Sequence, residues 1–407
     1  MSLITTLRSV IRFRPIELDP IRRRLSRAAN IEDLRNVAKR RLPSGVFDYI
    51  DGGAEDEDAL MRNTADFTSI EVKPRVLRDV SKIETKVNLL GSTRPMPLAL
   101  SPTGFTRIAH SQGELAVARS AARAGLPYAL STMGTRSIEE VAQVSDGPKW
   151  FQVYTWKDRG LVAEMLQRAE QAGYEAAILT VDTAVLGRRE RDVRRGYTLP
   201  PKIGLDTVID GIIHPWWTMD FLRNDPITFA NVASGNPAED GSSTAVSLAE
   251  YINSQFDPAL SWDDVEWIKS VWNRPLILKG VQTVADATQA VTAGVDAIAL
   301  SNHGGRQLDS APSIISLIEP VAQQVGGEVE IYCDGGVRRG SDIFKAVALG
   351  ATGCMIGRAY LYGLGAAGEQ GVDHVLDFLA SGLRQTMALS GCQTIDDITR
   401  DMVDWRR

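Results

Sequence analysis

Residues 292–305, "TAGVDAIALSNHGG", contain one complete unit of the pattern that decides the fold. The first residues end an alanine-rich, amphipathic stretch at Gly294, and glycine commonly follows the last turn of a helix. Residues 296–301 then form a nearly continuous apolar run, which is the composition of a strand buried on both faces of a parallel sheet. The polar, glycine-rich residues that follow predict a loop at the carboxyl end of that strand.

The same unit recurs along the chain from about residue 96. Eight apolar runs share this composition, and they cover residues 97–101, 127–131, 150–154, 176–182, 276–280, 296–301, 329–334 and 353–357. The amphipathic stretches between them predict helices, among them 111–124, 158–172, 284–293 and 340–349. Eight strands joined by crossover helices predict an α/β fold of the (β/α)8, or TIM barrel, type.

Further helices are predicted on both sides of the barrel. Residues 31–95 predict a small helical cap, with Asn30 as the N-cap of its first helix and a glycine pair ending a short second helix. Residues 368–389 predict a long closing helix. We therefore expect one barrel domain over residues 31–407, preceded by a basic extension over residues 1–30.

One long insertion interrupts the repeat between the fourth and fifth strands. It covers residues 183–261, and insertions of this length are commonly lids or binding elements. Residues 204–225 contain a tryptophan pair among apolar and charged residues. They fit either contact with a membrane surface or a cover over the barrel mouth or a neighbouring subunit. Residues 231–247 are polar and rich in Gly and Ser, so we expect this part to be mobile.

The composition limits the classes of partner and compartment. A net charge of -6 argues against nucleic acid as the main partner. The arginines of residues 1–30 suit either a solvated extension, which we favour, or contact with an anionic membrane surface. No apolar run approaches the roughly 18 residues of a transmembrane helix, and no signal-peptide core is found. Cys333, Cys354 and Cys392 lack metal-ligand spacing, so we expect reduced thiols, no metal and a cytoplasmic protein.

Polar, charged or glycine residues stand at the carboxyl end of every predicted strand. In chain order they are Ser101-Pro102-Thr103-Gly104, Ser131-Thr132, Gln152 and Tyr154, Thr180 and Asp182, Lys279, residues 301–306, Asp334-Gly335-Gly336, and Gly357-Arg358. In a TIM barrel this end carries the active site. Turn chemistry explains one or two polar strand ends but not eight in succession, so the barrel mouth is the predicted site.

Two loops at this mouth predict an anion site. They cover residues 334–342 and 356–359, after the seventh and eighth strands, where barrels often bind phosphate. Their glycines let backbone N–H groups approach an anion, and Arg338 or Arg358 can donate two hydrogen bonds to phosphate oxygens. A Gly-x-Gly-x-x-Gly pattern at residues 363–368 follows the last strand instead of opening a βαβ unit, so we expect a loop between helices rather than a dinucleotide site.

His303, Arg306 and Asp182 form the sharpest set of residues at the mouth. An arginine can bind a carboxylate with two hydrogen bonds, a histidine can act as a general base, and a carboxylate can stabilise the imidazolium that results. Lys279 ends an apolar run and needs a partner. The residues leave open a flavin edge that becomes anionic on reduction, or a Schiff base in a flavin-free lyase. This set argues against the remaining alternative, a barrel that binds phosphate or flavin without catalysis.

These segments resemble the FMN-dependent L-2-hydroxy acid oxidase and dehydrogenase family. "SNHGGRQLD" (301–309) is similar to the active-site signature of that family. The further landmarks, in chain order, are "FDYIDGGAEDE", "SPTGF", "WFQVYTWKDR", "LTVDTAVLGRRERD", "LKGV", "DGGVRRGSD" and "IGRA", so the resemblance runs from about residue 31 to the C-terminus. It implies FMN as cofactor and oxidation of an L-2-hydroxy acid to a 2-oxo acid, with electrons passed on to O2, a quinone or a haem.

The resemblance also implies roles for the residues at matched positions. His303 would be the catalytic base, paired with Asp182, and Tyr154 would contact the substrate hydroxyl. The substrate carboxylate would bind Tyr49, Arg189 and Arg306. FMN would be held by Pro102, Thr103, Gly104, Ser131, Gln152, Thr180, Lys279, Ser301 and Gly335, with its phosphate at Asp334, Gly336, Arg338, Gly357 and Arg358.

Two positions and the insertion bear on the subgroup. Glycolate oxidases have a tryptophan where this chain has Met133, which lines the substrate pocket, and Gly104 replaces an alanine found in many oxidases. The insertion resembles that of quinone-linked L-lactate and mandelate dehydrogenases, some of which associate with the inner membrane. We therefore expect oxidation of L-lactate with a quinone as acceptor and a homotetramer. Peripheral contact with the inner membrane, an O2-using oxidase and a mandelate dehydrogenase stay open.

Overall fold

A computed structural model of the chain describes residues 17–194, 204–233 and 255–406. At its centre is a closed barrel of eight parallel strands, which are β4 (Leu98–Leu100), β5 (Tyr128–Ser131), β6 (Lys149–Tyr154), β7 (Ala176–Thr180), β8 (Leu276–Val281), β9 (Ala297–Ser301), β10 (Glu330–Asp334) and β11 (Gly353–Ile356). Each strand pairs with its neighbours in the chain, and β11 closes the ring by pairing with β4. The predicted TIM barrel and its eight strands are confirmed.

The interior of the barrel is packed with apolar side chains away from the mouth. Trp150 and Tyr332 meet edge to face, with ring centroids 5.8 Å apart. Leu89 packs with them from a hairpin of two short strands, β2 (Val87–Leu89) and β3 (Ser92–Arg94). Burial of each such side chain contributes about 1.5–3 kcal/mol. The polar strand ends are therefore left to line the other end of the barrel.

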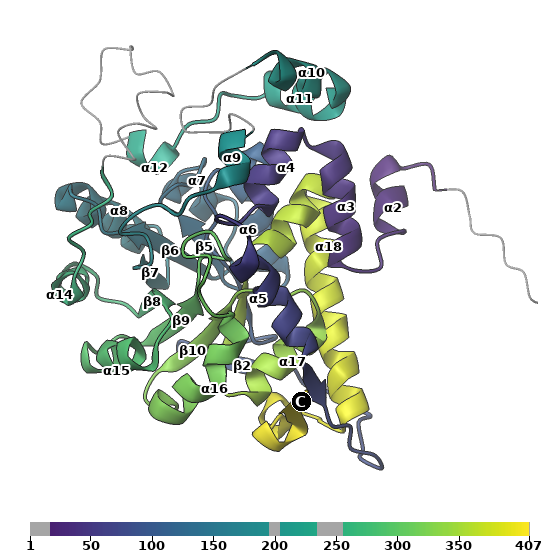
Figure 1. Cartoon of the computed structure of the whole chain (residues 1–407), viewed down its shortest axis with the longest axis vertical. Helices are drawn as coiled ribbons and strands as arrows, with labels where there is room; N and C mark the ends of the chain where they lie inside the picture. Colours follow the sequence, from purple (N-terminus) through teal and green to yellow (C-terminus); the bar gives the residue numbers. More distant parts are fainter. Residues whose placement is uncertain (1–16, 195–203, 234–254, 407) are drawn as a thin grey trace, which may run out of the picture.

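An outer layer of helices covers the barrel (Figure 1). The helices that follow the strands are α6 (Gly113–Arg123), α7 (Ile138–Gln143), α8 (Arg159–Gln171), α14 (Trp262–Val271), α15 (Val284–Thr292), α16 (Ile314–Val325), α17 (Gly340–Ala348) and α18 (Arg358–Ser390), with a 3-10 turn η1 (Thr106–Ile108) before α6. Gly125 and Gly294 follow α6 and α15 with φ of +68° and +69°, which only glycine adopts without strain. The helices predicted between the strands agree closely with these bounds.

The N-terminal segment forms the predicted helical cap beside α18 (Figure 1). Its helices are α2 (Pro20–Leu25), α3 (Ile31–Arg41), α4 (Ser44–Asp51) and α5 (Asp58–Thr68). The side chain of Asn30 accepts a hydrogen bond from the backbone N–H of Asp33 at 2.8 Å, as predicted for an N-cap. Ile21 and Leu25 of α2 pack against the core. The extension is therefore packed on one side over residues 17–30, while its arginines Arg22, Arg23 and Arg27 stay exposed.

The C-terminal part of the chain closes the barrel through α18 and two 3-10 turns, η2 (Ile395–Asp397) and η3 (Arg400–Met402). A final strand, β12 (Val403–Trp405), pairs antiparallel with β1 (Ile70–Val72). Helix α18 departs from helical geometry only at Ala367 and Gly368, so the break predicted between two helices over residues 363–368 is present but is confined to a kink at these two residues. A Cβ on Gly363 would lie 2.4 Å from the carbonyl oxygen of Gly371, so these glycines allow the two arms of the kink to pack closely.

The insertion lies over the barrel mouth (Figure 1). Its described helices are α9 (Glu190–Arg194), α10 (Leu205–Ile213), α11 (Pro215–Arg223) and α12 (Ala230–Ala233). Helices α10 and α11 contact each other as a helical hairpin at the top of the figure. Most of the polar segment 231–247 lies outside the described residues, so its mobility stays a prediction. Within the described ranges, no helix is long and apolar enough to cross a membrane.

Candidate functional site

One cavity opens at the carboxyl ends of the barrel strands. Its lining includes Ser101, Pro102, Thr103 and Gly104 after β4, Met133 after β5, Tyr154 and Lys279 on β6 and β8, His303, Gly304 and Arg306 after β9, residues 334–338 after β10, Gly357 and Arg358 after β11, Tyr49 from α4 and Arg189 from the insertion. The strand ends singled out in the sequence thus meet at one place, as the parallel barrel requires.

His303 and Asp182 form a hydrogen-bonded pair at this mouth. The Nδ1 of His303 lies 3.0 Å from Asp182 Oδ1, and only 4% of the Asp182 side chain is exposed. A Cβ on Gly280 would lie 2.8 Å from the Asp182 Cβ, so glycine at φ +111° makes room for the carboxylate. Burial lowers the pKa of His303, while Asp182 acts in the opposite direction. The imidazole is therefore held neutral, oriented by a carboxylate that can stabilise its protonated form.

Arg306 and Arg189 bring two guanidinium groups to the same cavity. Arg306 donates hydrogen bonds to the backbone carbonyls of Tyr49 at 2.6 Å and Gly52 at 3.1 Å, and lies over the Tyr49 ring. Burial and the nearby Arg189 lower the pKa of Arg306 to about 9. Neither arginine forms an ion pair with a carboxylate within the described part of the chain. Two cations without such a partner favour an anion at this position.

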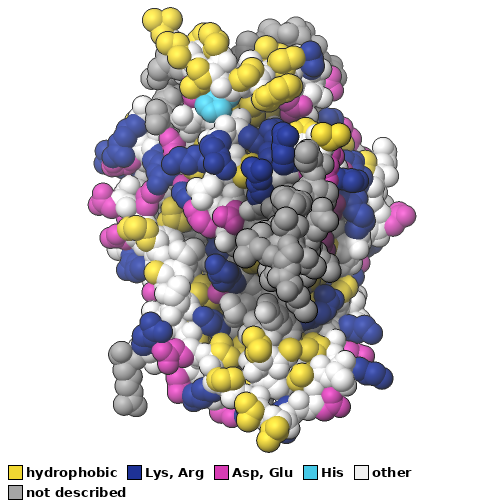
Figure 2. Space-filling view, turned by 90° about the vertical axis from the view of Figure 1, so that its right-hand side faces the viewer, with side chains coloured by type: hydrophobic (Ala, Val, Ile, Leu, Met, Phe, Trp, Pro, Cys, Tyr) yellow, Lys and Arg dark blue, Asp and Glu magenta, His cyan; other side chains and the backbone are white. Residues whose placement is uncertain are grey.

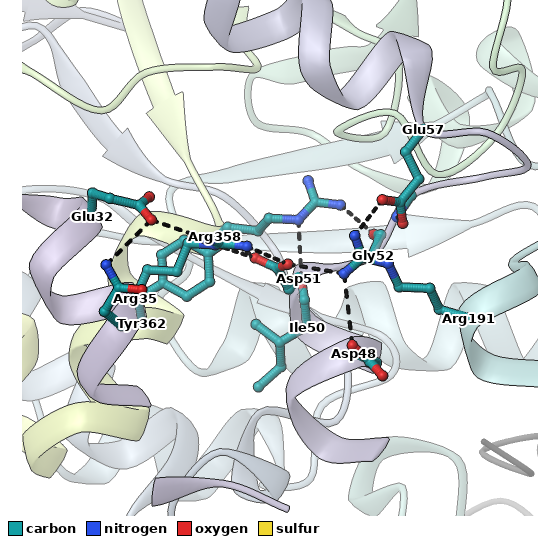
Figure 3. Close-up of polar contacts among 12 residues, drawn as sticks. Glu32, Arg35, Asp48, Ile50, Asp51, Gly52, Glu57, Arg191, Arg358 and Tyr362 are labelled. Atoms are coloured by element: carbon teal, nitrogen blue, oxygen red, sulfur yellow. Dashed lines mark hydrogen bonds and ion pairs between the residues drawn. The ribbon is translucent and has the colours of Figure 1, made fainter. Parts of the chain in front are cut away.

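A network of charged groups fixes the end of α4 next to this anion site (Figure 3). Arg35 donates to both carboxylate oxygens of Asp51 at 2.6 and 2.8 Å, and Arg191 and the Tyr362 hydroxyl add bonds at 3.0 and 2.8 Å. Burial alone would raise the pKa of Asp51, but these donors hold it at about 2. Because Asp51 follows Tyr49 by two residues, the network also holds Tyr49 and its carbonyl in place.

Arg358 joins the same network from the start of α18. Its guanidinium donates to the backbone carbonyls of Ile50 at 3.0 Å and Gly52 at 2.6 Å (Figure 3). It also donates to the carbonyl of Gly304 at 2.7 Å. Burial lowers its pKa. Arg358 therefore ties the end of α4 to the turn that carries His303. Since three of its five N–H donors are taken by backbone carbonyls, this geometry gives only limited support to the prediction that Arg358 binds a phosphate.

Lys279, near the end of β8, is ion-paired inside the protein. Its Nζ lies 2.9 Å from Asp334 Oδ2 and donates to Ser301 Oγ at 3.1 Å. Burial alone would lower the pKa of Lys279, but Asp334 opposes this and the pKa lies above its usual value. A Schiff-base lysine must lose its proton before it attacks a carbonyl. The contacts therefore argue against the flavin-free lyase.

The loops after β10 and β11 keep one arginine available for an anion. Arg338 donates to the carbonyl of Val337 at 2.8 Å and lies over the Tyr362 ring. Gly336 must be glycine, because a Cβ there would lie 1.7 Å from the carbonyl oxygen of Asn63. Asp334, by contrast, faces Lys279, which helps to lower its pKa although burial opposes this. An ionised carboxylate repels a phosphate, so a contact of Asp334 with phosphate finds no support in its surroundings.

Four further predicted residues are buried at strand ends behind the cavity wall, namely Ser131, Gln152, Thr180 and Ser301. Ser131 Oγ donates to Gln152 Oε1 at 2.9 Å. The Nε2 of Gln152 is buried and has no hydrogen-bond partner among the described residues. An unpaired buried amide of this kind usually marks a missing ligand or water. This orphaned donor therefore fits the polar edge of a flavin bound at the mouth.

An apolar wall completes the cavity, and it was not predicted from the sequence. It is formed by Phe105, Ile108, Leu186, Phe229 and Phe256, three of which come from the insertion. Single aromatic residues in irregular segments give no periodic signal, so nothing in the sequence singled them out. Met133 lies against Gly104, where an added Cβ would be 2.8 Å from the Met133 Cβ. A larger residue at position 104 would therefore clash with Met133 unless Met133 moved.

Comparison with known proteins sets this geometry in context. A family model described as FMN-dependent dehydrogenase matches residues 38–405. A protein of Mycobacterium tuberculosis named "Putative L-lactate dehydrogenase" is 44% identical over 406 residues, which cover 99% of this chain and 96% of the relative. Glycolate oxidase 1 of Oryza sativa subsp. indica is 42% identical over 371 residues, which cover 91% of this chain and 94% of the relative.

Solved structures are similar over almost the same length. The crystal structure of the monotopic membrane protein (S)-mandelate dehydrogenase has a TM-score of 0.89 at 38% identity, covering 93% of this chain and 100% of that chain. Mandelate oxidase with (S)-4-hydroxymandelic acid has a TM-score of 0.80 at 36% identity, covering 93% and 98%. The relatives are named for three different hydroxy acids, so the substrate of this chain has to be argued from its own cavity.

Proposed function

Because the chain belongs to the family of FMN-dependent dehydrogenases, we propose that it oxidises L-lactate to pyruvate and passes the electrons to a quinone. The observation that carries the proposal is the placement of the His303–Asp182 pair beside Arg189 and Arg306 in one cavity. A general base next to unneutralised guanidinium groups is complementary to a carboxylate and a hydroxyl on adjacent carbons, which is the structure of a 2-hydroxy acid.

The arginines and tyrosines would bind the substrate. Arg189 and Arg306 would take its carboxylate, with Tyr49 beside them. Burial raises the pKa of Tyr154 to about 12, so its hydroxyl stays protonated at neutral pH and can donate to the substrate oxygen. An anion between the two guanidinium groups would also relieve the repulsion that lowers the pKa of Arg306. Substrate binding would therefore be strongest for acids in their ionised form.

His303 would act as the base. Asp182 occupies its Nδ1, so Nε2 is the nitrogen left to accept the substrate proton. FMN, when bound, accepts the two electrons that leave the substrate. The residues that would hold it are those around the cavity, with Gln152 Nε2 and Lys279 as donors to the flavin edge, Pro102, Thr103 and Gly104 along its face, and Gly336, Arg338 and Gly357 at the phosphate.

The apolar wall supports a second candidate substrate. Phe105 and Phe229 have ring centroids 5.6 Å apart, and Phe256 packs edge to face on Tyr154 at 5.3 Å. Such a wall can pack against the phenyl ring of L-mandelate as well as a methyl group. We favour L-lactate because the 44% identical relative bears that name over nearly the whole chain. The ratio of flavin reduction rates with L-lactate and L-mandelate decides between them.

One experiment tests both the reaction and the acceptor. The purified yellow protein is mixed anaerobically with L-lactate, L-mandelate, glycolate and longer L-2-hydroxy acids, and the loss of flavin absorbance is followed. The reduced protein is then mixed with a soluble quinone or with O2. We expect fast bleaching and preferential reoxidation by the quinone. Peroxide formation at the rate of substrate turnover would instead make it an oxidase, and no bleaching by any acid would remove the proposal.

We also propose that the α10–α11 hairpin rests on a membrane surface. Its exposed apolar residues are Leu205, Val208, Ile209, Ile212, Ile213, Trp216, Met219, Phe221 and Leu222. An apolar patch of this kind on a surface helix pair suits the boundary between headgroups and acyl chains. The structural relative called a monotopic membrane protein supports this placement. Ile212→Ser with Leu222→Ser should reduce sedimentation with vesicles, whereas Leu389→Ser, at an exposed position on α18, should not.

The homotetramer remains a prediction as well. Light scattering on the purified holoenzyme would give the mass directly. A mass near four times 44.4 kDa supports the tetramer, and a mass near one or two chains excludes it.

A further inference from the structure

A second cavity lies below the α10–α11 hairpin, outside the barrel mouth. It has a volume of 480 Å³. It is bounded by α2, α3, α11, the turn at Ala109–His110 and Gly365 of α18. Three arginines and two tryptophans face it, namely Arg23, Arg24, Arg41, Trp216 and Trp217. The reaction at the barrel mouth uses none of these residues.

The arginines of this cavity have few side-chain partners among the described residues. Arg23, Arg24 and Arg41 form no ion pair with a carboxylate in the described ranges. The Nε of Arg24 is buried and without a hydrogen-bond partner there, and burial lowers the pKa of Arg24 although Asp19 opposes this. The Nε of Arg41 donates only to the carbonyl of Gly365, at 3.2 Å. Three guanidinium groups around one cavity favour an anion as its ligand.

Asp220, the acidic residue of the lining, is already engaged. Its carboxylate accepts hydrogen bonds from the backbone N–H and hydroxyl of Ser111 at 2.9 and 2.7 Å, and it faces His110 Nδ1 at 3.8 Å. It therefore holds α11 to the turn before α6 rather than neutralising the arginines. Trp217 fixes α11 at a second point, through its indole N–H on the carbonyl of Ile108 at 2.8 Å.

The position of the cavity bears on the kind of anion that would fit it. Figure 2 shows hydrophobic side chains gathered at the top of this face, where α10 and α11 lie in Figure 1, and a band of Lys and Arg side chains directly beneath them. Trp216 of α11 is 74% exposed and also lines the cavity together with the arginines. From the centre of a bilayer outward, acyl chains come first, then the interfacial zone that tryptophans prefer, then the phosphates. The apolar residues of the hairpin, the tryptophans and the arginines of the cavity would match these three layers.

We propose that this cavity binds the phosphate of an anionic phospholipid whose acyl chains lie along the α10–α11 hairpin. The guanidinium groups of Arg24 and Arg41 take the phosphate oxygens, and Trp216 packs at the level of the glycerol. The inference rests on the membrane contact proposed above and adds a specific lipid to it. Substrate oxidation at the barrel mouth does not depend on it.

The test uses the full-length holoenzyme and vesicles of phosphatidylcholine, with and without phosphatidylglycerol. The variant Arg24→Gln/Arg41→Gln is compared with Arg27→Gln/Arg40→Gln, which removes the same charge from exposed arginines that do not line the cavity. Neutralising an arginine near an anionic surface costs about fivefold in binding wherever it lies. We expect the cavity pair to lose at least about tenfold more affinity for the anionic vesicles than the control pair. Equal losses would overturn the proposal.

A short-chain, soluble phosphatidylglycerol separates this inference from the membrane contact itself. It should raise the melting temperature of the wild type but not that of Arg24→Gln/Arg41→Gln, and inorganic phosphate at the same concentration should have a smaller effect. An equal shift with inorganic phosphate would make the cavity a general phosphate site and overturn the lipid assignment. If the same variant instead raised only the KM for a soluble quinone, the cavity would be an acceptor site. Flavin reduction by L-lactate should be unchanged in all these variants.

Discussion

The barrel mouth and the cavity beneath the hairpin both collect arginines, but in opposite surroundings. At the mouth, Arg189 and Arg306 line the same cavity as the apolar wall. Burial and the nearby Arg189 lower the pKa of Arg306 to about 9. Beneath the hairpin, Arg23 is exposed and Arg24 is only half-buried. A buried cation has lost its hydration, so a small anion that can enter the cavity stabilises it most. An exposed cation keeps its hydration and can instead bind the charged headgroup of a lipid at the surface. Burial, more than charge, separates the two ligand classes.

The two regions are joined by hydrogen bonds. Asp210 of α10 accepts from the backbone N–H of Ser44, at the start of α4, at 2.5 Å. Trp217 of α11 donates to the carbonyl of Ile108, whose side chain lines the mouth. The hairpin therefore rests on two walls of the active cavity while its other face is apolar and exposed. The following variants test how far chemistry at the mouth is independent of the hairpin.

His303→Gln should have the largest effect. Glutamine cannot take a proton at neutral pH, so anaerobic flavin reduction by L-lactate should slow about 10²- to 10⁴-fold. Bound FMN and sedimentation with vesicles should be unchanged, because neither the phosphate loops nor the hairpin is touched. His374→Gln, on α18, is the control, because the Nε2 of His374 lies 2.9 Å from the backbone carbonyl of Ala28, away from the barrel mouth. A rate in His303→Gln close to that of the control would show that His303 is not the base.

Arg189→Met should have the next largest effect. Loss of a partly buried charge that pairs with the substrate costs about 3 kcal/mol, or roughly 100-fold in kcat/KM. The loss should fall mainly on KM, since the base remains in place. Arg188→Met removes the neighbouring charge, which is 77% exposed and lies 3.6 Å from Glu190, and should leave both constants near those of the wild type. Similar losses in the two variants would assign the effect to general electrostatics instead of a carboxylate contact.

The barrel, and most of the residues that line its mouth, could be predicted from the sequence for a physical reason. Strands buried on both faces require continuous apolar runs, and parallel strands bring all their carboxyl ends to one rim. Ser101, Asp182, Lys279 and His303 therefore meet in space although they are far apart in the chain. Their partners were not predictable in the same way. The ion pair of Lys279 with Asp334 depends on which side chains face each other across the mouth, and strand pattern alone does not specify this.

The network around Asp51 shows the limit most clearly. Its donors Arg35, Arg191 and Tyr362 come from α3, α9 and α18, which no local pattern connects (Figure 3). The same holds for Arg358, whose position after the last strand suggested phosphate but whose donors reach three carbonyls. A basic residue at a strand end predicts that a positive charge is needed there. It does not predict whether an external ligand or the backbone receives the hydrogen bonds.

Asp182→Asn should change the pH dependence of kcat/KM more than it changes the affinity for the substrate. The base must be neutral to act, so kcat/KM should fall as pH drops through the pKa of His303, which burial places below the usual value of 6.5. Asp182 raises that pKa, so its removal should move the acid limb to still lower pH. The plateau rate should also fall, by about tenfold or more, because the imidazolium loses its partner. An acid limb that stays in place would mean that another group controls it.

The smallest expected effect tests the link between the two regions. Asp210→Asn weakens the cap of α4, and loss of an N-cap bond costs about 1 kcal/mol or less when an amide oxygen can still accept. Because α4 carries Tyr49, we expect a rise of up to about fivefold in the KM for L-lactate, with vesicle binding unchanged. Asp377→Asn, at an exposed position on α18, is the matched control. If vesicles added to the variant restored the wild-type KM, the membrane-bound hairpin would hold α4 without its cap. If the KM for L-lactate did not change, substrate binding at the mouth would not depend on the contact between α10 and α4. The active site and the cavity beneath the hairpin would then be functionally independent.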